Sequence, residues 1–360
     1  MTLLTKDLAE TVAALDRIVP SRTPDPLHSQ ILIRFSPSGL TLRAALPEID
    51  LELTLATQGK AESAVLVPAH LLAGIVRSLP GEEVQIEIAP SGGLDISSGS
   101  FRTKLSTIAA SEFPPSPDGR RETRELFAPE LVRALAQVRY AAASEEYRGA
   151  FRGVELGQSH ELLWAVATDG FRLALYQTRA SGGEDFKILL PSSSADELVR
   201  ILKEETGNVT LGIEQGGIVV EFSRGRVWLA LMEGELPDWR RVIPGKFVAE
   251  SRVSAEALRE ILRRMNILAE PENHRVDLVF EADRVVLSAE GNYGYAREEL
   301  AALTQGELPL AISFNARFLE DSLKSIRSEA ILKLSGSTSQ AVIVPGQDQA
   351  YLAVVVPLRI

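Results

Sequence analysis

The sequence predicts an α+β fold in which one module is repeated three times along the chain. Three observations support this prediction. Three amphipathic helix windows occupy similar places in successive segments, three further windows follow at a constant spacing, and the rest alternates apolar with polar residues. Such alternation is typical of antiparallel sheets with one face on a core and one face on water. We therefore expect three modules, each with two helices packed on antiparallel sheet.

The first helix of each module is predicted from apolar residues that recur three and four positions apart. In the third module, for example, Leu258, Ile261 and Leu262 fall on one helical face. Each window begins with a capping-type residue or a proline. The three windows cover residues 5–18, 129–141 and 254–268.

The second helix of each module follows a short apolar strand. These helices are predicted to begin at Pro68, Ser192 and Asn315, which are 124 and 123 residues apart. A spacing this constant is hard to obtain by chance and indicates repeated structure. The windows cover residues 68–79, 192–205 and 315–328.

The joins between modules are predicted from composition. Stretches rich in proline and charge occur at residues 113–125 and 237–250, between segments with strand-like alternation. We therefore place three domains at residues 1–122, 123–247 and 248–360. Gene duplication without a shared function is the alternative explanation of the repeats.

Composition bounds the class of protein. The 360 residues are 45% hydrophobic and 24% charged, which is ordinary for a folded chain of two to four domains. The absence of cysteine excludes disulfides and cysteine nucleophiles and fits a reducing compartment. The N-terminus lacks the apolar core of a signal peptide, and no segment is long enough to span a membrane. We expect a cytoplasmic protein.

The distribution of charge is more informative than its sum. A net charge of −11 argues by itself against contact with DNA. However, the six helix windows contain 13 basic and 12 acidic residues, so the acidity lies in strands and loops. Helices that all faced the hole of a ring would tolerate a polyanion there, although such charges can equally be ordinary solvated faces. The basic residues expected to face DNA in these windows are Arg133, Arg139, Arg200, Lys203, Arg263 and Lys324.

Three short motifs stand out along the chain: VATDGFRL at 166–173, LPDWRRVIP at 236–244 and VVVPLRI at 354–360. They resemble, in that order, the signatures ATD-x-x-RLA, FPDYRRVLP and VVMPMRL of the bacterial DNA polymerase III beta subunit family, the DNA sliding clamps. The resemblance runs over essentially the whole chain. It implies three similar domains, a head-to-tail homodimer that closes a six-domain ring around double-stranded DNA, no enzymatic activity and no cofactor. It also implies a clamp loader that opens the ring, and replicative and other polymerases, mismatch-repair proteins and ligase-type proteins that dock through short peptides.

The resemblance places a peptide-binding pocket between the second and third domains. Its residues would be Phe151, Thr168, Gly170, Phe171, Arg172, Leu173, Pro237, Arg241, Val242, Thr338, Val354, Val356, Arg359 and Ile360. The residues themselves also favour a groove here, because chain ends are usually polar and this one is almost wholly apolar. A last strand that only completes a sheet is the alternative.

Several pocket residues have more than one interpretation. The three arginines would hydrogen-bond a partner's carbonyls or carboxylate, or else form weak surface salt bridges. Asp169 and Gly170 are typical of a turn, which makes Asp169 a turn-capping residue rather than a catalytic one. Phe171 stands where the family often has His, so we expect it to keep an apolar wall without a titratable group. Val356 and Leu358 replace family methionines, and Thr338 is more polar than the expected Val.

The resemblance also points to a dimer seam and to two further DNA-facing residues. Leu71, Ile75 and Leu79 in the first domain would meet Ile267 and Leu268 in the third. The first three form one helical stripe, for which an ordinary core position is the alternative. Arg22 and Arg77 would face DNA.

No enzyme motif emerges from the sequence. The four histidines have no metal-site spacing, no G-x-S-x-G elbow occurs, and Gly245-Lys246 lacks the context of a phosphate loop. We therefore expect no catalytic residue and no metal. The alternative function is a repeat-built scaffold that binds peptides and never encircles DNA.

Overall fold

The computed structural model describes residues 1–57, 62–90, 92–117, 122–180, 184–214 and 216–358. The chain forms two compact units: unit 1 is Met1–Pro129 with Arg200–Leu231, and unit 2 is Glu130–Val199 with Met232–Ile360. The middle repeat therefore contributes to both units.

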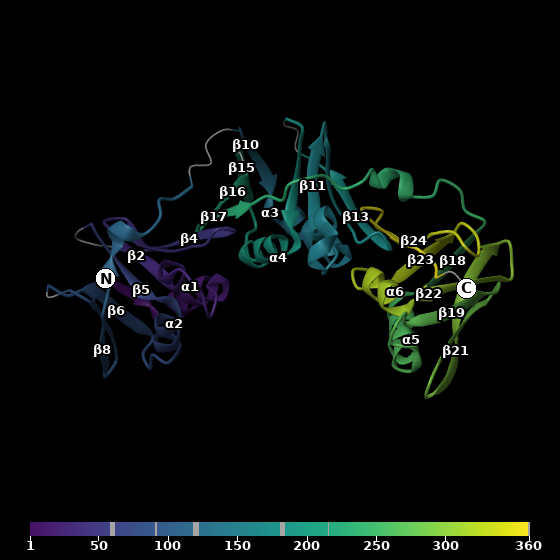
Figure 1. Ribbon diagram of the computed structural model, residues 1–360, viewed down its shortest axis with the longest axis horizontal. Coiled ribbons are helices and arrows are strands. Elements are labelled where there is room, and N and C mark those ends of the chain that lie inside the picture. Colours follow the sequence, from purple (N-terminus) through teal and green to yellow (C-terminus); the bar gives the residue numbers. More distant parts are fainter. Residues whose placement is uncertain (58–61, 91, 118–121, 181–183, 215, 359–360) are drawn as a thin grey trace. The chain divides into compact units, whose positions relative to one another are not determined.

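The order of elements confirms three repeats (Figure 1). Each repeat consists of a strand, a helix, four strands, a second helix and three strands, with short 3-10 helices (η) in the connections. The first repeat contains β1 (Thr2–Leu4), α1 (Thr5–Ile18), η1 (Pro26–Ser29), β2 (Gln30–Ser36), β3 (Gly39–Ala45), β4 (Ile49–Ala56), β5 (Ser63–Pro68), α2 (Ala69–Arg77), β6 (Glu83–Ile88), β7 (Leu94–Ser98) and β8 (Phe101–Leu105), followed by β9 (Ile108–Ala109) and η2 (Ala110–Glu112).

The second repeat contains β10 (Glu122–Phe127), α3 (Ala128–Val138), η3 (Arg139–Ala141), η4 (Glu146–Arg152), β11 (Gly153–Ser159), β12 (Leu162–Thr168), β13 (Arg172–Arg179), β14 (Phe186–Pro191), α4 (Ser192–Ile201), β15 (Asn208–Glu214), β16 (Gly217–Phe222), β17 (Gly225–Ala230) and η5 (Trp239–Val242). The third contains β18 (Ala249–Ser254), α5 (Ala255–Leu268), β19 (Arg275–Phe280), β20 (Arg284–Gly291), β21 (Gly294–Gly306), β22 (Leu310–Asn315), α6 (Ala316–Leu323), β23 (Glu329–Leu334), β24 (Ala341–Pro345) and β25 (Tyr351–Val355).

Helix starts agree closely with the sequence, whereas two helix ends do not. Asn315 caps α6, because its Oδ1 accepts hydrogen bonds from the backbone N–H groups of Arg317 and Phe318. Ser254 caps α5 in the same way through Ala257 N. The predictions that the second helices extend to residues 205 and 328 are wrong: α4 ends at Ile201 and α6 at Leu323. The polar run KEETGN follows the first end, and the chain must turn there to enter β15.

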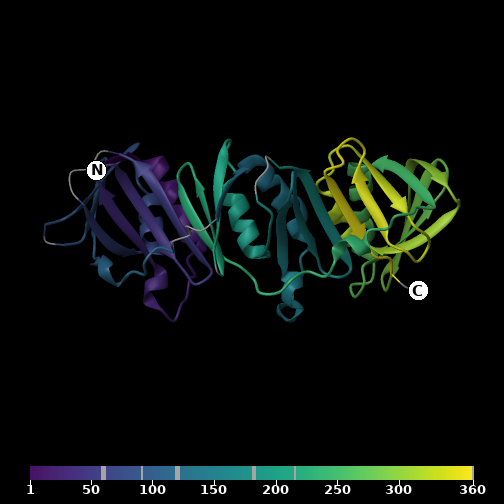
Figure 2. The ribbon, with the colours of Figure 1, turned by 90° about the horizontal axis from the view of Figure 1, so that it is seen from above.

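The strands pair antiparallel throughout the described residues. Unit 1 holds a four-stranded sheet, β1-β6-β7-β8, and a nine-stranded sheet, β10-β15-β16-β17-β4-β3-β2-β5-β9. Unit 2 holds one twelve-stranded sheet, β14-β11-β12-β13-β25-β24-β23-β18-β21-β20-β19-β22, in which the C-terminal strands β24 and β25 are yellow in Figure 2.

Two strand pairs join successive repeats. In unit 1, β17 of the second repeat pairs with β4 of the first, with Val227 opposite Leu51. In unit 2, β25 of the third repeat pairs with β13 of the second, with Val354 opposite Leu173. Both joins use the same two positions of the module, its fourth and its last strand.

The helices bury one apolar face each. In unit 1, α1 and α2 lie side by side, and α1 buries Leu8, Val12 and Leu15. In unit 2, α5 and α6 form the equivalent pair (Figure 1). Burying a Leu or Val side chain fully contributes about 1.5–3 kcal/mol, so these faces account for much of the packing energy.

The first predicted join is held by a buried arginine. The Arg43 side chain, on β3, pairs with Asp50 and also donates hydrogen bonds to the carbonyl oxygens of Pro114 and Pro115. A buried guanidinium needs such partners, because an unpaired buried charge is strongly unfavourable. The proline-rich join is therefore anchored to the sheet at its N-terminal end.

Candidate functional site

A largely apolar cavity of about 170 Å³ lies in unit 2, where β12, β13 and β25 meet the segment leading to the third repeat. It is lined by Phe151, Thr168, Gly170, Arg172, Leu173, Pro237, Trp239, Val242, Val354 and Val356. The structure thus brings together nine of the residues that the sequence assigned to a pocket, from η4, the β12–β13 turn, η5 and the end of the chain.

The β12–β13 turn is held by its own side chains. The Asp169 carboxylate accepts hydrogen bonds from the N–H groups of Phe171 and Arg172, both at 2.9 Å. Thr168 Oγ1 accepts from Gly170 N and donates to Arg172 O. Gly170 has a φ of 89°, a left-handed conformation that favours glycine. The prediction that Asp169 caps a turn is confirmed.

The C-terminal segment completes a sheet and also lines the cavity, so a last strand and a groove-lining segment are not exclusive interpretations of its apolar residues. β25 pairs with β13 and β24, and Val356 N donates to Phe171 O at 2.9 Å. Val354 and Leu173 are each only 1% exposed and form the base of the cavity.

Trp239 is the lining residue that the sequence reasoning missed. It is the first residue of η5 and is 4% exposed. A signal was present, since a single large aromatic residue stands between charged residues in a polar connecting segment. Large aromatic residues in such places are often buried anchors.

Arg172 lines the cavity, but its guanidinium is engaged within the protein. It donates to Asp169 and to Asp321 of α6, and it stacks over the rings of Tyr140 and Phe318. Burial raises the pKa of the Tyr140 hydroxyl, which lies 2.7 Å from the hydroxyl of Tyr351. This cluster ties the second repeat to the third beside the cavity, a role different from the predicted hydrogen bond to a partner.

The structure places three of the predicted pocket residues outside the cavity lining. Phe171 precedes β13 and is 51% exposed, and the Arg148 guanidinium is stacked 5.4 Å from its ring centre. Arg241 points to solvent and pairs with Asp238. Thr338 lies between β23 and β24 and lines a separate cavity of about 620 Å³ with Asp277 and Ser313. Arg359 and Ile360 lie outside the described residues.

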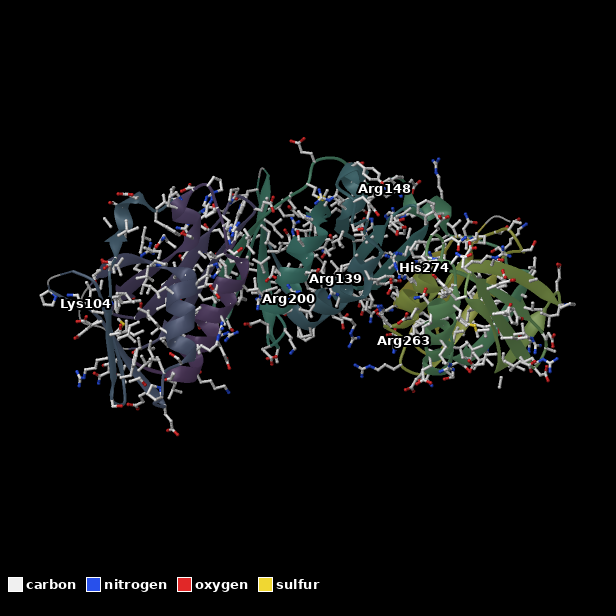
Figure 3. The ribbon with its side chains drawn as sticks, turned by 60° about the horizontal axis from the view of Figure 1, so that its bottom comes forward. Lys104, Arg139, Arg148, Arg200, Arg263 and His274 are labelled. Carbon is white, nitrogen blue, oxygen red and sulfur yellow. The ribbon has the colours of Figure 1, made fainter. Side chains whose placement is uncertain are left out.

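The basic residues predicted to face DNA are largely paired with acids. The pairs are Arg133 with Glu130, Arg139 with Asp196, Lys203 with Glu204, Arg263 with Glu320 and Lys324 with Asp321. Arg139 and Arg263 are both marked in Figure 3. Arg22, Arg77 and Arg200 are exposed. Exposed ion pairs of this kind are individually weak.

The predicted seam residues lie at the surface or at its edge. Leu71 on α2 is 50% exposed and Ile267 on α5 is 80% exposed, while Ile75, Leu79 and Leu268 are half-buried. The core of α2 is formed instead by Leu72 and Val76. Exposed apolar residues at helix surfaces are available for contact with a partner.

The described residues contain neither a candidate metal site nor a candidate membrane-spanning helix. His, Asp and Glu side chains form no group of three that could hold a metal ion within the described ranges. In the same part of the chain, no helix has both the length and the apolar character needed to cross a membrane.

Comparison with known proteins gives the same family along the whole chain. Residues 1–117, 125–238 and 240–359 match the N-terminal, central and C-terminal domains of the DNA polymerase III beta subunit. The beta sliding clamp of Synechococcus elongatus is 28% identical over 98% of this chain and 97% of its own length.

Solved structures agree. The Pseudomonas aeruginosa sliding clamp bound to griselimycin is 25% identical with a TM-score of 0.95, and the Thermotoga maritima beta subunit is 28% identical with a TM-score of 0.91. Each covers 100% of this chain, and the match covers 99% of each relative. The chain therefore belongs to the family of bacterial DNA polymerase III beta subunits, the sliding clamps that make replicative DNA synthesis processive.

Proposed function

We propose that this chain acts as a closed ring around double-stranded DNA, formed by a head-to-tail homodimer with three domains per chain at residues 1–122, 123–247 and 248–360. The ring has no catalytic activity and no cofactor of its own. It holds polymerases at the DNA through a peptide-binding pocket, and a clamp loader places it there.

One observation carries the ring proposal: the first and the third repeat each have a strand edge of the kind that joins the repeats within the chain. The joins β17–β4 and β25–β13 each pair a last strand with a fourth strand. The remaining last strand is β8, and the remaining fourth strand is β21. Of the described strands, β8 pairs only with β7, and residues 294–301 of β21 pair only with β20. Pairing β8 of one protomer with β21 of its partner would repeat the same join and close the ring.

Side chains at these edges support such a contact. β8 carries Arg102 and Lys104, whereas residues 294–301 of β21 carry two glutamates, Glu298 and Glu299, one arginine, Arg297, and the exposed Tyr295. Leu71 on α2 and Ile267 on α5 add exposed apolar surface in the first and the third repeat. Opposite charges and apolar residues across paired edges are what a specific antiparallel contact requires.

Contact with DNA in this ring is expected to be loose. Five of the eight basic residues predicted to face DNA are paired with acids, and the net charge of the chain is −11. Few phosphates would then be neutralised firmly, so affinity would be low and the ring would move along the duplex. Topological enclosure, rather than charge, would keep the ring on DNA.

We propose that the 170 Å³ cavity receives a large apolar side chain of a partner peptide. The partners are the replicative and other polymerases, the clamp loader, and mismatch-repair and ligase-type proteins. Val354 and Leu173 at its base and Val242 at its rim form an anchor-in-pocket site. Griselimycin, the ligand of the Pseudomonas aeruginosa relative, would occupy the same cavity.

The ring proposal is tested by loading the protein onto nicked circular DNA with a bacterial clamp loader and ATP, then washing in high salt. The circle should retain the protein, and a single cut in the DNA should release it, because only a topological link resists salt and fails at a free end. A clamp of known loading activity is the control for the loader.

Equal loss from circular and cut DNA in high salt would contradict the ring and favour the alternative function, a peptide-binding scaffold that does not encircle DNA. That alternative is supported by the acidic composition alone. The two free strand edges favour the ring.

A further inference from the structure

A buried carboxylate lies behind the wall of the proposed pocket. Glu155, on β11, is 5% exposed. Its Oε1 accepts a hydrogen bond from the indole N–H of Trp164 on β12 and another from the indole N–H of Trp239 on η5, both at 3.1 Å. One carboxylate oxygen therefore holds two aromatic rings from different parts of the chain.

These two hydrogen bonds give partners to the Glu155 carboxylate and to both indole N–H groups. A buried carboxylate is unfavourable unless it is hydrogen-bonded, and an indole N–H can only donate. Neither tryptophan is more than 6% exposed, so each needs an acceptor within the protein. Loss of Glu155 would leave two buried donors without a partner.

The second ring, Trp239, is a wall of the cavity. Its face is covered by the Arg240 guanidinium, 4.1 Å from the ring centre, which also lies 5.5 Å from the ring centre of Trp164. The indole is thus held at its N–H edge by Glu155 and across its face by Arg240.

A glycine makes room for the first ring. A Cβ added at Gly157 would come within 2.3 Å of a ring atom of Trp164. The Trp164 ring therefore lies close over β11, two residues from Glu155 along the same strand. The sheet and the connecting segment are joined through this one acceptor.

We infer that Glu155 is a positioning residue for peptide binding: it never touches the peptide, and it sets the place of the Trp239 wall by accepting that ring's N–H. This inference rests on the proposed function of the cavity. It distinguishes Glu155 from residues such as Val242 that line the cavity directly.

The test compares Glu155→Leu with Glu155→Gln in the full-length chain. Griselimycin and a fluorescein-labelled synthetic peptide ending in Leu-Phe serve as probes, with affinity measured by calorimetry and fluorescence anisotropy. Glu155→Leu removes the acceptor and should weaken binding of both probes by about tenfold, the effect of one lost hydrogen bond to a charged group. Glu155→Gln keeps a carbonyl acceptor and should stay within about threefold of the unsubstituted chain.

Trp164→Phe is the matched control. It removes the other hydrogen bond to the same carboxylate, but its ring is not part of the cavity lining. Affinity in this variant should change by less than about twofold, well below the effect of one lost hydrogen bond.

The indole N–H signals of the three tryptophans give a readout that a general loss of stability would not imitate. Glu155→Leu should shift the signals of Trp164 and Trp239 and leave that of Trp228, which donates to Glu214 in unit 1. If Glu155→Leu fails to fold, Trp239→Phe takes its place, because it keeps an aromatic ring at the wall but removes the N–H that Glu155 accepts. It should weaken binding by about tenfold, and an affinity within about twofold of the unsubstituted chain would contradict the positioning role.

The outcomes separate the two proposals. Failure of the unsubstituted chain to bind either probe would overturn the proposed pocket. If the unsubstituted chain and Glu155→Leu bind the probes with equal affinity, the positioning role would be overturned, whereas the proposed pocket would stand. An equal loss of affinity in Glu155→Gln and Glu155→Leu would also contradict the positioning role, because the loss would then not depend on a hydrogen-bond acceptor at residue 155.

Discussion

At the residue scale, buried polar groups in unit 2 are paired with aromatic side chains. The hydroxyl of Tyr176 is an example: the residue is 1% exposed and donates to Glu130 at 2.8 Å. Burial, reinforced by that hydrogen bond, raises the pKa of Tyr176 to about 12. A neighbouring cation, Arg133, lies close enough to have its own pKa raised by the Tyr176 hydroxyl.

This shift predicts an alkaline loss of stability. Unfolded tyrosine ionises near pH 10.0, whereas the folded protein holds the Tyr176 proton to about pH 12. The stabilisation is therefore complete below pH 10 and disappears as the pH rises through about 12. Urea unfolding across this range should show a smaller fall in Tyr176→Phe than in the unsubstituted chain. An identical fall in both would contradict the assignment and point to Tyr140 and Tyr351, whose pKa values burial also raises.

At the element scale, two short 3-10 helices supply apolar walls of the pocket to the strands that form its base. η4 contributes Phe151, and η5 contributes Trp239 and Val242. Such short elements have few hydrogen bonds of their own, so side-chain anchors such as the Trp239 indole hold them in place.

This arrangement predicts that a carboxylate placed on η5 at the cavity rim weakens binding while leaving the fold intact. Val242 is 37% exposed at the cavity rim, so the fold can hold a solvated carboxylate there. Val242→Asp would, however, place that carboxylate against an apolar side chain of the peptide. Griselimycin affinity, measured by calorimetry, should fall at least about tenfold. Leu162→Asp is the matched control, because Leu162 is 40% exposed and is not part of the lining. Equal affinity in both variants would place the ligand elsewhere.

At the scale of the whole molecule, the repeats meet through the same pair of strand positions each time. Two such joins are made within the chain, and the remaining pair of positions, β8 and β21, is the pair that we propose to meet across the dimer. A head-to-tail dimer has two equivalent contacts, so one substitution alters both of them.

Single substitutions should therefore dissociate the dimer. Leu71→Glu and Ile267→Glu each place a carboxylate on exposed apolar surface at one predicted end of the protomer. Sedimentation velocity should show a dimer for the unsubstituted chain and a shift toward monomer in each variant. The Leu71→Glu variant should also not be retained on circular DNA. A monomeric unsubstituted chain, or dimers that survive both substitutions, would contradict the proposed seam.

The sequence by itself determined the features that depend on neighbours in the chain. The periodic apolar residues predicted the helices, Ser254 and Asn315 predicted where two of them begin, and Asp169 with Gly170 predicted the turn at the pocket. The constant spacing of the second helices predicted three repeats. Each of these reflects local geometry, in which residues a few positions apart share a face or close a turn.

Only the tertiary structure decided what distant segments do to one another. It paired Leu173 with Val354, placed Arg172 against Asp321, and gave two tryptophan rings one carboxylate on Glu155. Apolar alternation shows that a strand has a buried face, but it does not say which edge it pairs with. Partners on different strands and connecting segments are chosen by the packing of whole sheets, which no local pattern records.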